Sequence, residues 1–132
     1  MTFKRLSYLS VLVAFMITPL ILLVNSCKHE GISADQMPQV CFTEEVLPIF
    51  QNSCGTTGCH DSKSAESGYT FTDYASIMKS ITPGDADKSE AYKAITSTFQ
   101  LMPPDNALPA SKRTIIRLWI EQGAKETTCK TN

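Results

Sequence analysis

The 132-residue chain is predicted to be all-α, with short helices separated by long loops. Three observations predict this class. Four segments carry apolar residues at helical spacing, and nothing after the N-terminal leader alternates apolar and polar residues for long enough to form a sheet. The part expected to fold has about ninety residues, which is enough for one modest core that would benefit from a covalent or cofactor staple.

The first helix is expected over residues 43–54. Thr43 is the expected N-cap, and Glu44 and Glu45 follow in the first turn, where the helix dipole favours acidic side chains. Pro48 is tolerated because it lies near the start of the helix. The apolar set of this segment is Val46, Leu47, Ile49 and Phe50.

Three more helices are expected over residues 71–81, 87–99 and 109–124. Gly123 is the expected C-terminal stop of the last one. The predicted apolar faces are Tyr74, Ile77, Met78 and Ile81 in the first, Tyr92, Ile95 and Phe99 in the second, and Ile115, Ile116, Trp119 and Ile120 in the third.

The N-terminus has the order of an export signal. Lys4 and Arg5 precede an uncharged, mainly apolar run over residues 6–24. The ending "LVNSC" resembles a bacterial lipobox, which implies cleavage before Cys27 and a lipid on that cysteine. An uncleaved anchor is the alternative, since the run is long enough to span a membrane, although Pro19 makes it a poor span. Both interpretations place the rest of the chain outside the cytoplasm.

Three regions follow from this assignment. Residues 1–26 form the signal peptide, residues 27–40 lack apolar periodicity and form a flexible tether, and residues 41–130 form the folded domain. The signal carries two basic and no acidic residues. The remaining 106 residues therefore have ten basic and thirteen acidic residues, a formal charge of −3. This balance lacks the basic footprint of nucleic-acid binding and suits a soluble head held near a membrane by a lipid.

Residues 54–61 read "CGTTGCHD", and this motif indicates the chemistry of the chain. Two cysteines followed directly by a histidine form the arrangement that attaches c-type haem, in which the thiols bond to the porphyrin and His60 binds iron. The usual motif has two intervening residues, and this one has four. Gly55 and Gly58 can adopt the positive φ angles that a longer loop needs.

The motif alone leaves two other interpretations open. Cys54 and Cys59 would also suit a disulfide, in which His60 has no role. They would also suit a zinc site with His60, for which a fourth ligand must come from Cys41, Cys129 or His29.

Five segments between Val46 and Ala124 together resemble the class I c-type cytochromes, and in particular the small exported bacterial domains called planctomycete-type cytochrome c. In order they read "VLPIFQNSCGTTGCHD", "SGYTFTDYASIM", "ITPGDADKSEAYKAI", "LMPP" and "IIRLWIEQGA". The resemblance implies a class I cytochrome c-like fold wrapped around one haem, with the first and last helices crossing near its edge. It also implies covalent haem c at Cys54 and Cys59, with His60 as proximal and Met102 as distal ligand.

The residues around Met102 agree with this role. Met102 follows His60 by 42 residues in a proline-rich loop, so it can approach a haem from the opposite side. His29 is the competing ligand, but it would lose much conformational entropy on leaving the tether. Arg113 and Arg117 are candidates to meet the propionates. The residues expected to line the pocket are Leu47, Phe50, Phe99, Leu101, Ile116, Trp119 and Ile120.

The chain has five cysteines, and the resemblance accounts for the two in the motif. With Cys27 lipidated, Cys41 and Cys129 are left, and an oxidising compartment would pair them where geometry allows. They flank the first and last helices, so the implied helix crossing would bring them together.

The predicted function is electron transfer to and from redox partner proteins. Filling both axial positions of the iron leaves no open site for oxygen or peroxide, which predicts a carrier and not an enzyme. The main alternative is an exported, disulfide-stapled binding module without haem. An enzymatic haem domain is the third candidate.

Overall fold

The computed structural model describes residues 31–104 and 106–129. The expected export signal, the lipidation site Cys27 and the alternative ligand His29 lie outside these residues. Within the described part every regular element is helical, which confirms the all-α prediction for that part. No helix in these ranges has the length and apolar character to span a membrane.

The first helical segment begins with a π-helical turn, η2 (Phe42–Val46), which continues directly into α2 (Leu47–Ser53). The predicted N-cap at Thr43 is wrong, because the helix begins at Phe42 and its N-cap is Cys41. The backbone N–H of Cys41 donates to Glu45 Oε2 at 2.7 Å, so a glutamate one turn ahead satisfies this donor. Thr43 instead shares a hydrogen bond of 3.0 Å with the hydroxyl of Thr128.

The second predicted helix is divided into α3 (Tyr74–Ile77) and the 3-10 turn η4 (Met78–Ser80). Asp73 is its N-cap and accepts the backbone N–H of Ser76 at 2.9 Å.

The third predicted helix is shorter than its apolar spacing suggested. Helix α4 (Glu90–Thr96) ends three residues before Phe99. The hydroxyl of Ser97 accepts the backbone N–H groups of Phe99 and Gln100 at 3.2 and 3.0 Å, and this local turn competes with another helical turn. Phe99 is therefore 96% exposed, and its predicted place on the apolar face is wrong.

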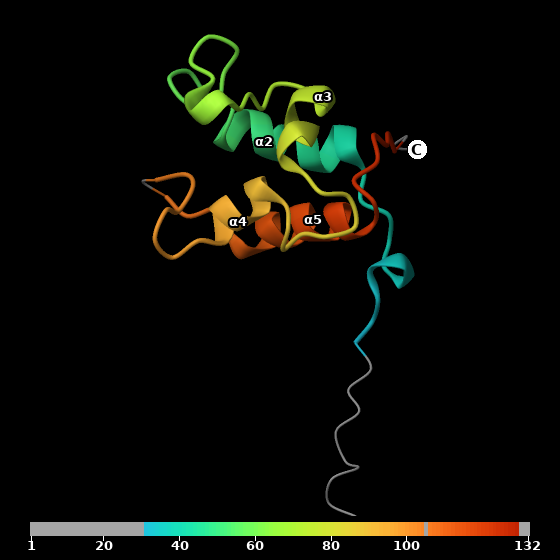
Figure 1. Cartoon of the computed structure of the whole chain (residues 1–132). Helices are drawn as coiled ribbons and strands as arrows, with labels where there is room; N and C mark the ends of the chain where they lie inside the picture. The colour runs from blue at the N-terminus through green and yellow to red at the C-terminus, as the bar shows by residue number, and fades with distance from the viewer. Residues whose placement is uncertain (1–30, 105, 130–132) are drawn as a thin grey trace, which may run out of the picture. The chain divides into compact units, whose positions relative to one another are not determined.

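The last helix, α5 (Ala110–Glu121), is the longest described element. Gly123 follows it with φ +95°, which agrees with its predicted role as the stop. Helix α5 packs against both η2 and α4, and Figure 1 shows α4 and α5 together below α2. The indole of Trp119 lies 5.4 Å from the ring of Phe42, centroid to centroid, at the centre of the core.

The two ends of the domain are fastened to each other. Cys41 and Cys129 form a disulfide, with Cα atoms 5.6 Å apart and a sequence separation of 88. Next to the bridge, the backbone N–H of Thr43 donates to the carbonyl of Thr127 at 3.0 Å. The pair that the sequence left for a disulfide is thus present.

Part of the predicted tether belongs to the folded unit. The side chain of Gln122 accepts the N–H of Val40 at 2.9 Å and donates to the carbonyls of Ala34 and Pro38, both at 3.0 Å. These bonds dock the segment on the end of α5, and Val40 is buried. The compact unit therefore begins at Ser33 and includes residues 33–40 of the expected tether.

Candidate functional site

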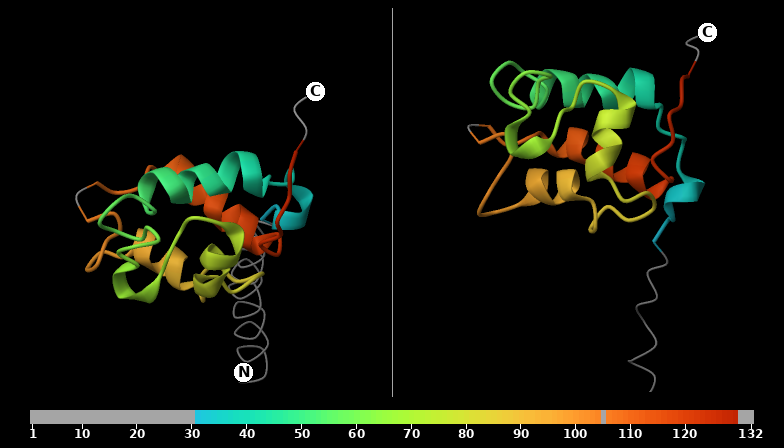
Figure 2. Two further views of the ribbon diagram at one scale, coloured as in Figure 1. Left: turned by 90° about the horizontal axis from the view of Figure 1, so that it is seen from above. Right: turned by 45° about the horizontal axis from the view of Figure 1, so that its top comes forward.

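A cavity of about 540 Å³ opens between the motif loop and α4. The loops at residues 54–70 and 97–104, green and orange, lie at the same end of the domain in both views of Figure 2. The volume of the cavity lies in the range of small-molecule and cofactor sites. The lining residues are Phe50, Ser53, Cys54, Gly58, Cys59, His60, Glu66, Ser67, Tyr69, Phe71, Ser80, Glu90, Ala91, Ala94, Ile95, Gln100, Met102, Pro103 and Pro104.

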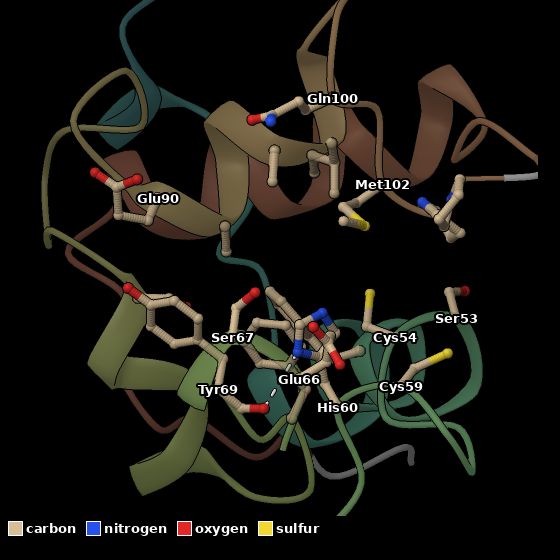
Figure 3. A pocket seen from close by; sticks show the side chains of 18 of the residues that line it. Ser53, Cys54, Cys59, His60, Glu66, Ser67, Tyr69, Glu90, Gln100 and Met102 are labelled. Atoms are coloured by element: carbon tan, nitrogen blue, oxygen red, sulfur yellow. Dashed lines mark hydrogen bonds between the residues drawn. The ribbon is translucent and has the colours of Figure 1, made fainter. Parts of the chain in front are cut away.

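The four side chains predicted to bind a haem all line this cavity. Figure 3 shows Met102 on one side and His60 on the other, with Cys54 and Cys59 beside His60. Met102 and His60 come from loops 42 positions apart in sequence, so only folding brings them to the same cavity. The set comprises two thiols, an imidazole and a thioether.

The two thiols of the motif are free and differ in environment. Cys54 is buried and Cys59 is exposed. Burial, and secondarily the charge of a Cys59 thiolate, raise the pKa of Cys54 to about 11, so its thiol stays protonated near neutral pH. The alternative of a bond between these two cysteines does not describe this structure.

The zinc alternative loses two of its three proposed fourth ligands. Cys41 and Cys129 are consumed by their mutual disulfide, and His29 lies outside the described residues. In the described ranges, three or more His, Cys, Asp or Glu side chains nowhere converge to hold a metal ion.

The ring of His60 is held by its neighbours. Its Nδ1 lies 3.2 Å from the carbonyl oxygen of Tyr69, the contact dashed in Figure 3. A carbonyl only accepts, so this bond requires the proton on Nδ1 and leaves the lone pair on Nε2 for a metal. The ring of Phe71 packs against the imidazole with centroids 4.7 Å apart, and the N–H of Phe71 donates to the carbonyl of His60 at 2.9 Å.

Met102 is fixed through its backbone. Its N–H donates to the carbonyl of Ala94 in α4 at 3.1 Å, which ties the proline-rich loop to a helix on the cavity wall. The side chain is partly buried and packs against the core.

The two glycines of the motif serve different purposes. Gly58 has φ +86°, as expected for a longer loop. Gly55 does not have a positive φ angle, which corrects the expectation for it. A Cβ at Gly55 would lie 2.7 Å from the carbonyl oxygen of Phe71, so a glycine is needed there for close backbone approach.

The expected lining was only partly right. Of its seven members, Phe50 lines the cavity, whereas Ile116, Trp119 and Ile120 belong to the core and Phe99 is exposed. Leu47 packs against the core, and Leu101 borders a shallower hollow beside the cavity.

Neither predicted arginine lines the cavity. The Nε of Arg117 donates to Glu121 at 2.6 Å, and its guanidinium lies 5.8 Å from the ring centroid of Tyr92. Arg113 has a buried Nε without a hydrogen-bond partner among the described residues. The expected contacts of these arginines with haem propionates stay a prediction.

Several residues that shape the site were missed from the sequence. Ala91 and Ala94 present small side chains three residues apart on α4, which leaves space for the cavity, and this spacing was visible in the sequence. Tyr69 was also missed, because it acts through its backbone carbonyl. Asp61, directly after His60, accepts three backbone N–H groups, and these bonds lower its pKa to about 2.

A family model for planctomycete cytochrome C matches residues 57–106. These 50 of the 132 residues include Cys59, His60 and Met102 but begin after Cys54. The chain is similar to that family over this stretch. No curated protein and no solved structure matches the chain.

Proposed function

We propose that this protein is an electron carrier with one covalently bound haem c. The carrying observation is that one cavity is lined by two free cysteine thiols, a histidine and a methionine. The similarity to planctomycete cytochrome C over residues 57–106 supports the same class.

These four side chains, which line the cavity, have the chemistry to hold haem c. Cys54 and Cys59 would form the two thioether bonds, while His60 and Met102 would bind the iron. When bound, the haem supplies a one-electron couple between ferrous and ferric iron. The protein's part is to orient the imidazole of His60 through the bond from Nδ1 to the carbonyl of Tyr69, and to hold Met102 through the carbonyl of Ala94. With two side chains of the chain available to bind the iron, the site would suit a carrier that exchanges electrons with redox partner proteins.

An exported binding module without haem is the second candidate. The disulfide between Cys41 and Cys129 and the open cavity suit it as well. Absorption spectra of the full chain, made in a host that attaches haem c, separate the two. The carrier keeps its colour with the polypeptide in acidified organic solvent, because thioether bonds survive extraction.

The double variant Cys54→Ala/Cys59→Ala is the matched test, and it is expected to lose all solvent-resistant haem. The control is the unaltered chain from a host without attachment machinery. A colourless wild-type protein from the competent host, with Cys54 and Cys59 unmodified by mass spectrometry, would overturn the carrier.

Export and anchoring form a separate proposal, in which Cys27 carries a lipid. The basic start, the apolar run and the sequence before Cys27 support it. Wild-type protein should incorporate radiolabelled palmitate and sediment with membranes. Cys27→Ser should accumulate as unlabelled precursor. A free mature N-terminus at another residue would contradict the assignment.

A further inference from the structure

Asp61 connects the two sides of the motif loop. Its Oδ2 accepts the N–H of Gly58, just before Cys59, at 2.7 Å. Its Oδ1 accepts the N–H groups of Lys63 and Ser64, after His60, at 2.7 and 3.1 Å. One carboxylate thus joins the segment that carries Cys59 to the turn that leaves His60, without itself lining the cavity.

The rest of the loop needs this connection. Four residues separate the two cysteines, and two of them are glycines, so the segment would lose much conformational entropy on becoming ordered. Backbone bonds from Cys59 to Thr56 at 3.0 Å and from His60 to Cys54 at 3.2 Å close the turn. Neither bond involves the N–H of Gly58, which lies next to Cys59 and has a left-handed conformation.

We infer that Asp61 is a positioning residue for haem attachment, which holds Cys59 at the distance and direction from Cys54 that double attachment needs. This inference rests on the proposed function. Asp61 acts through the backbone: fixing Gly58 fixes the start of the Cys59 residue, and fixing Lys63 and Ser64 keeps the chain after His60 from pulling the imidazole out of place. Without the hydrogen bonds to Asp61, one thiol can attach to the haem while the other points away from it.

Asp61→Asn tests this connection. An amide has one acceptor oxygen, so it can accept either from Gly58 or from Lys63 and Ser64, but not from both sides of the loop. Asp85→Asn is the matched control. Asp85 is also a half-buried aspartate that accepts a turn N–H, from Lys88 at 3.0 Å, and it does not line the cavity. It also pairs with the ammonium of Lys88 at 2.7 Å, a contact on the exposed surface. Both variants remove one negative charge, so a difference in haem attachment between them reports the location of the aspartate and not the loss of charge.

The readout is the ratio of doubly to singly attached haem in the full chain, from peptide mass spectrometry and the α-band of the pyridine haemochrome. In Asp61→Asn we expect this ratio to fall roughly two- to tenfold, the effect of losing one exposed hydrogen bond, and in Asp85→Asn to stay unchanged. An equal ratio in the two variants overturns the inference, whether or not it differs from wild type. If Asp61→Asn yields no folded protein, Asp61→Ser, which keeps one acceptor, takes its place.

Hydrogen exchange in the haem-free full chain separates this inference from the proposed function. Because the amide keeps only one acceptor, either the N–H of Gly58 or the N–H groups of Lys63 and Ser64 should exchange faster in Asp61→Asn than in wild type and Asp85→Asn. Wild-type protein that never binds haem while this difference persists would overturn the carrier but leave the positioning of the loop by Asp61. Equal exchange of Gly58, Lys63 and Ser64 in all three proteins would overturn the positioning itself.

Discussion

Replacing Met102 by alanine is expected to leave covalently attached haem with a vacant sixth position. Met102 lies across the cavity from His60 in Figure 3. Neither thiol depends on it, so attachment should survive. Loss of the thioether ligand should lower the reduction potential by on the order of 0.1 V, within the ~0.8 V that axial ligands span. Added imidazole or carbon monoxide should then bind readily.

Redox titration and absorption spectra with and without imidazole check this expectation. Met78→Ala is the matched control, because Met78 packs against the core without lining the cavity. It should lower stability and leave the spectrum and potential unchanged. If Met102→Ala keeps both unchanged while His29→Ala alters both, His29 is the sixth ligand.

The element that the sequence predicted best is α5, whose pattern of apolar residues runs for three turns and ends at Gly123. Its end could be predicted because a glycine, a residue type that commonly ends helices, follows its apolar pattern. The limits of η2 and α4 instead depend on hydrogen bonds from single side chains. Glu45 reaches back to the N–H of Cys41 at the start of η2, and the hydroxyl of Ser97 forms a turn after α4. Apolar spacing carries no information about either hydrogen bond.

The candidate site shows the same division. Cys54, Cys59 and His60 lie within seven consecutive residues, so their chemistry could be predicted from the sequence alone. The contributions of Tyr69 and Ala94 are backbone carbonyls, which every residue possesses. Only the folded chain shows which of these carbonyls meets the imidazole of His60.

Opening the bridge between Cys41 and Cys129 is expected to lower the free energy of unfolding by about 2–5 kcal/mol. The bond closes a loop across 88 positions, for which the chain-entropy model gives roughly 4–5 kcal/mol. The variant is Cys41→Ser/Cys129→Ser, which leaves no unpaired partner. Hydrogen bonds between Thr43 and the end of the chain remain possible in it, so the fold should persist at lower stability.

Urea unfolding of haem-free protein gives the difference, with Cys59→Ser as the control for loss of an exposed thiol. Neither Cys41 nor Cys129 lines the cavity, so in a competent host the double variant should still carry solvent-resistant haem. That outcome would separate a bridge that stabilises the fold from the thiols that bind the cofactor. Unchanged stability in the double variant, or both thiols found free in exported wild-type protein, would contradict a structural bridge. Because the bridge joins the start of η2 to the segment after α5, its loss should act first on the packing of Phe42 against Trp119.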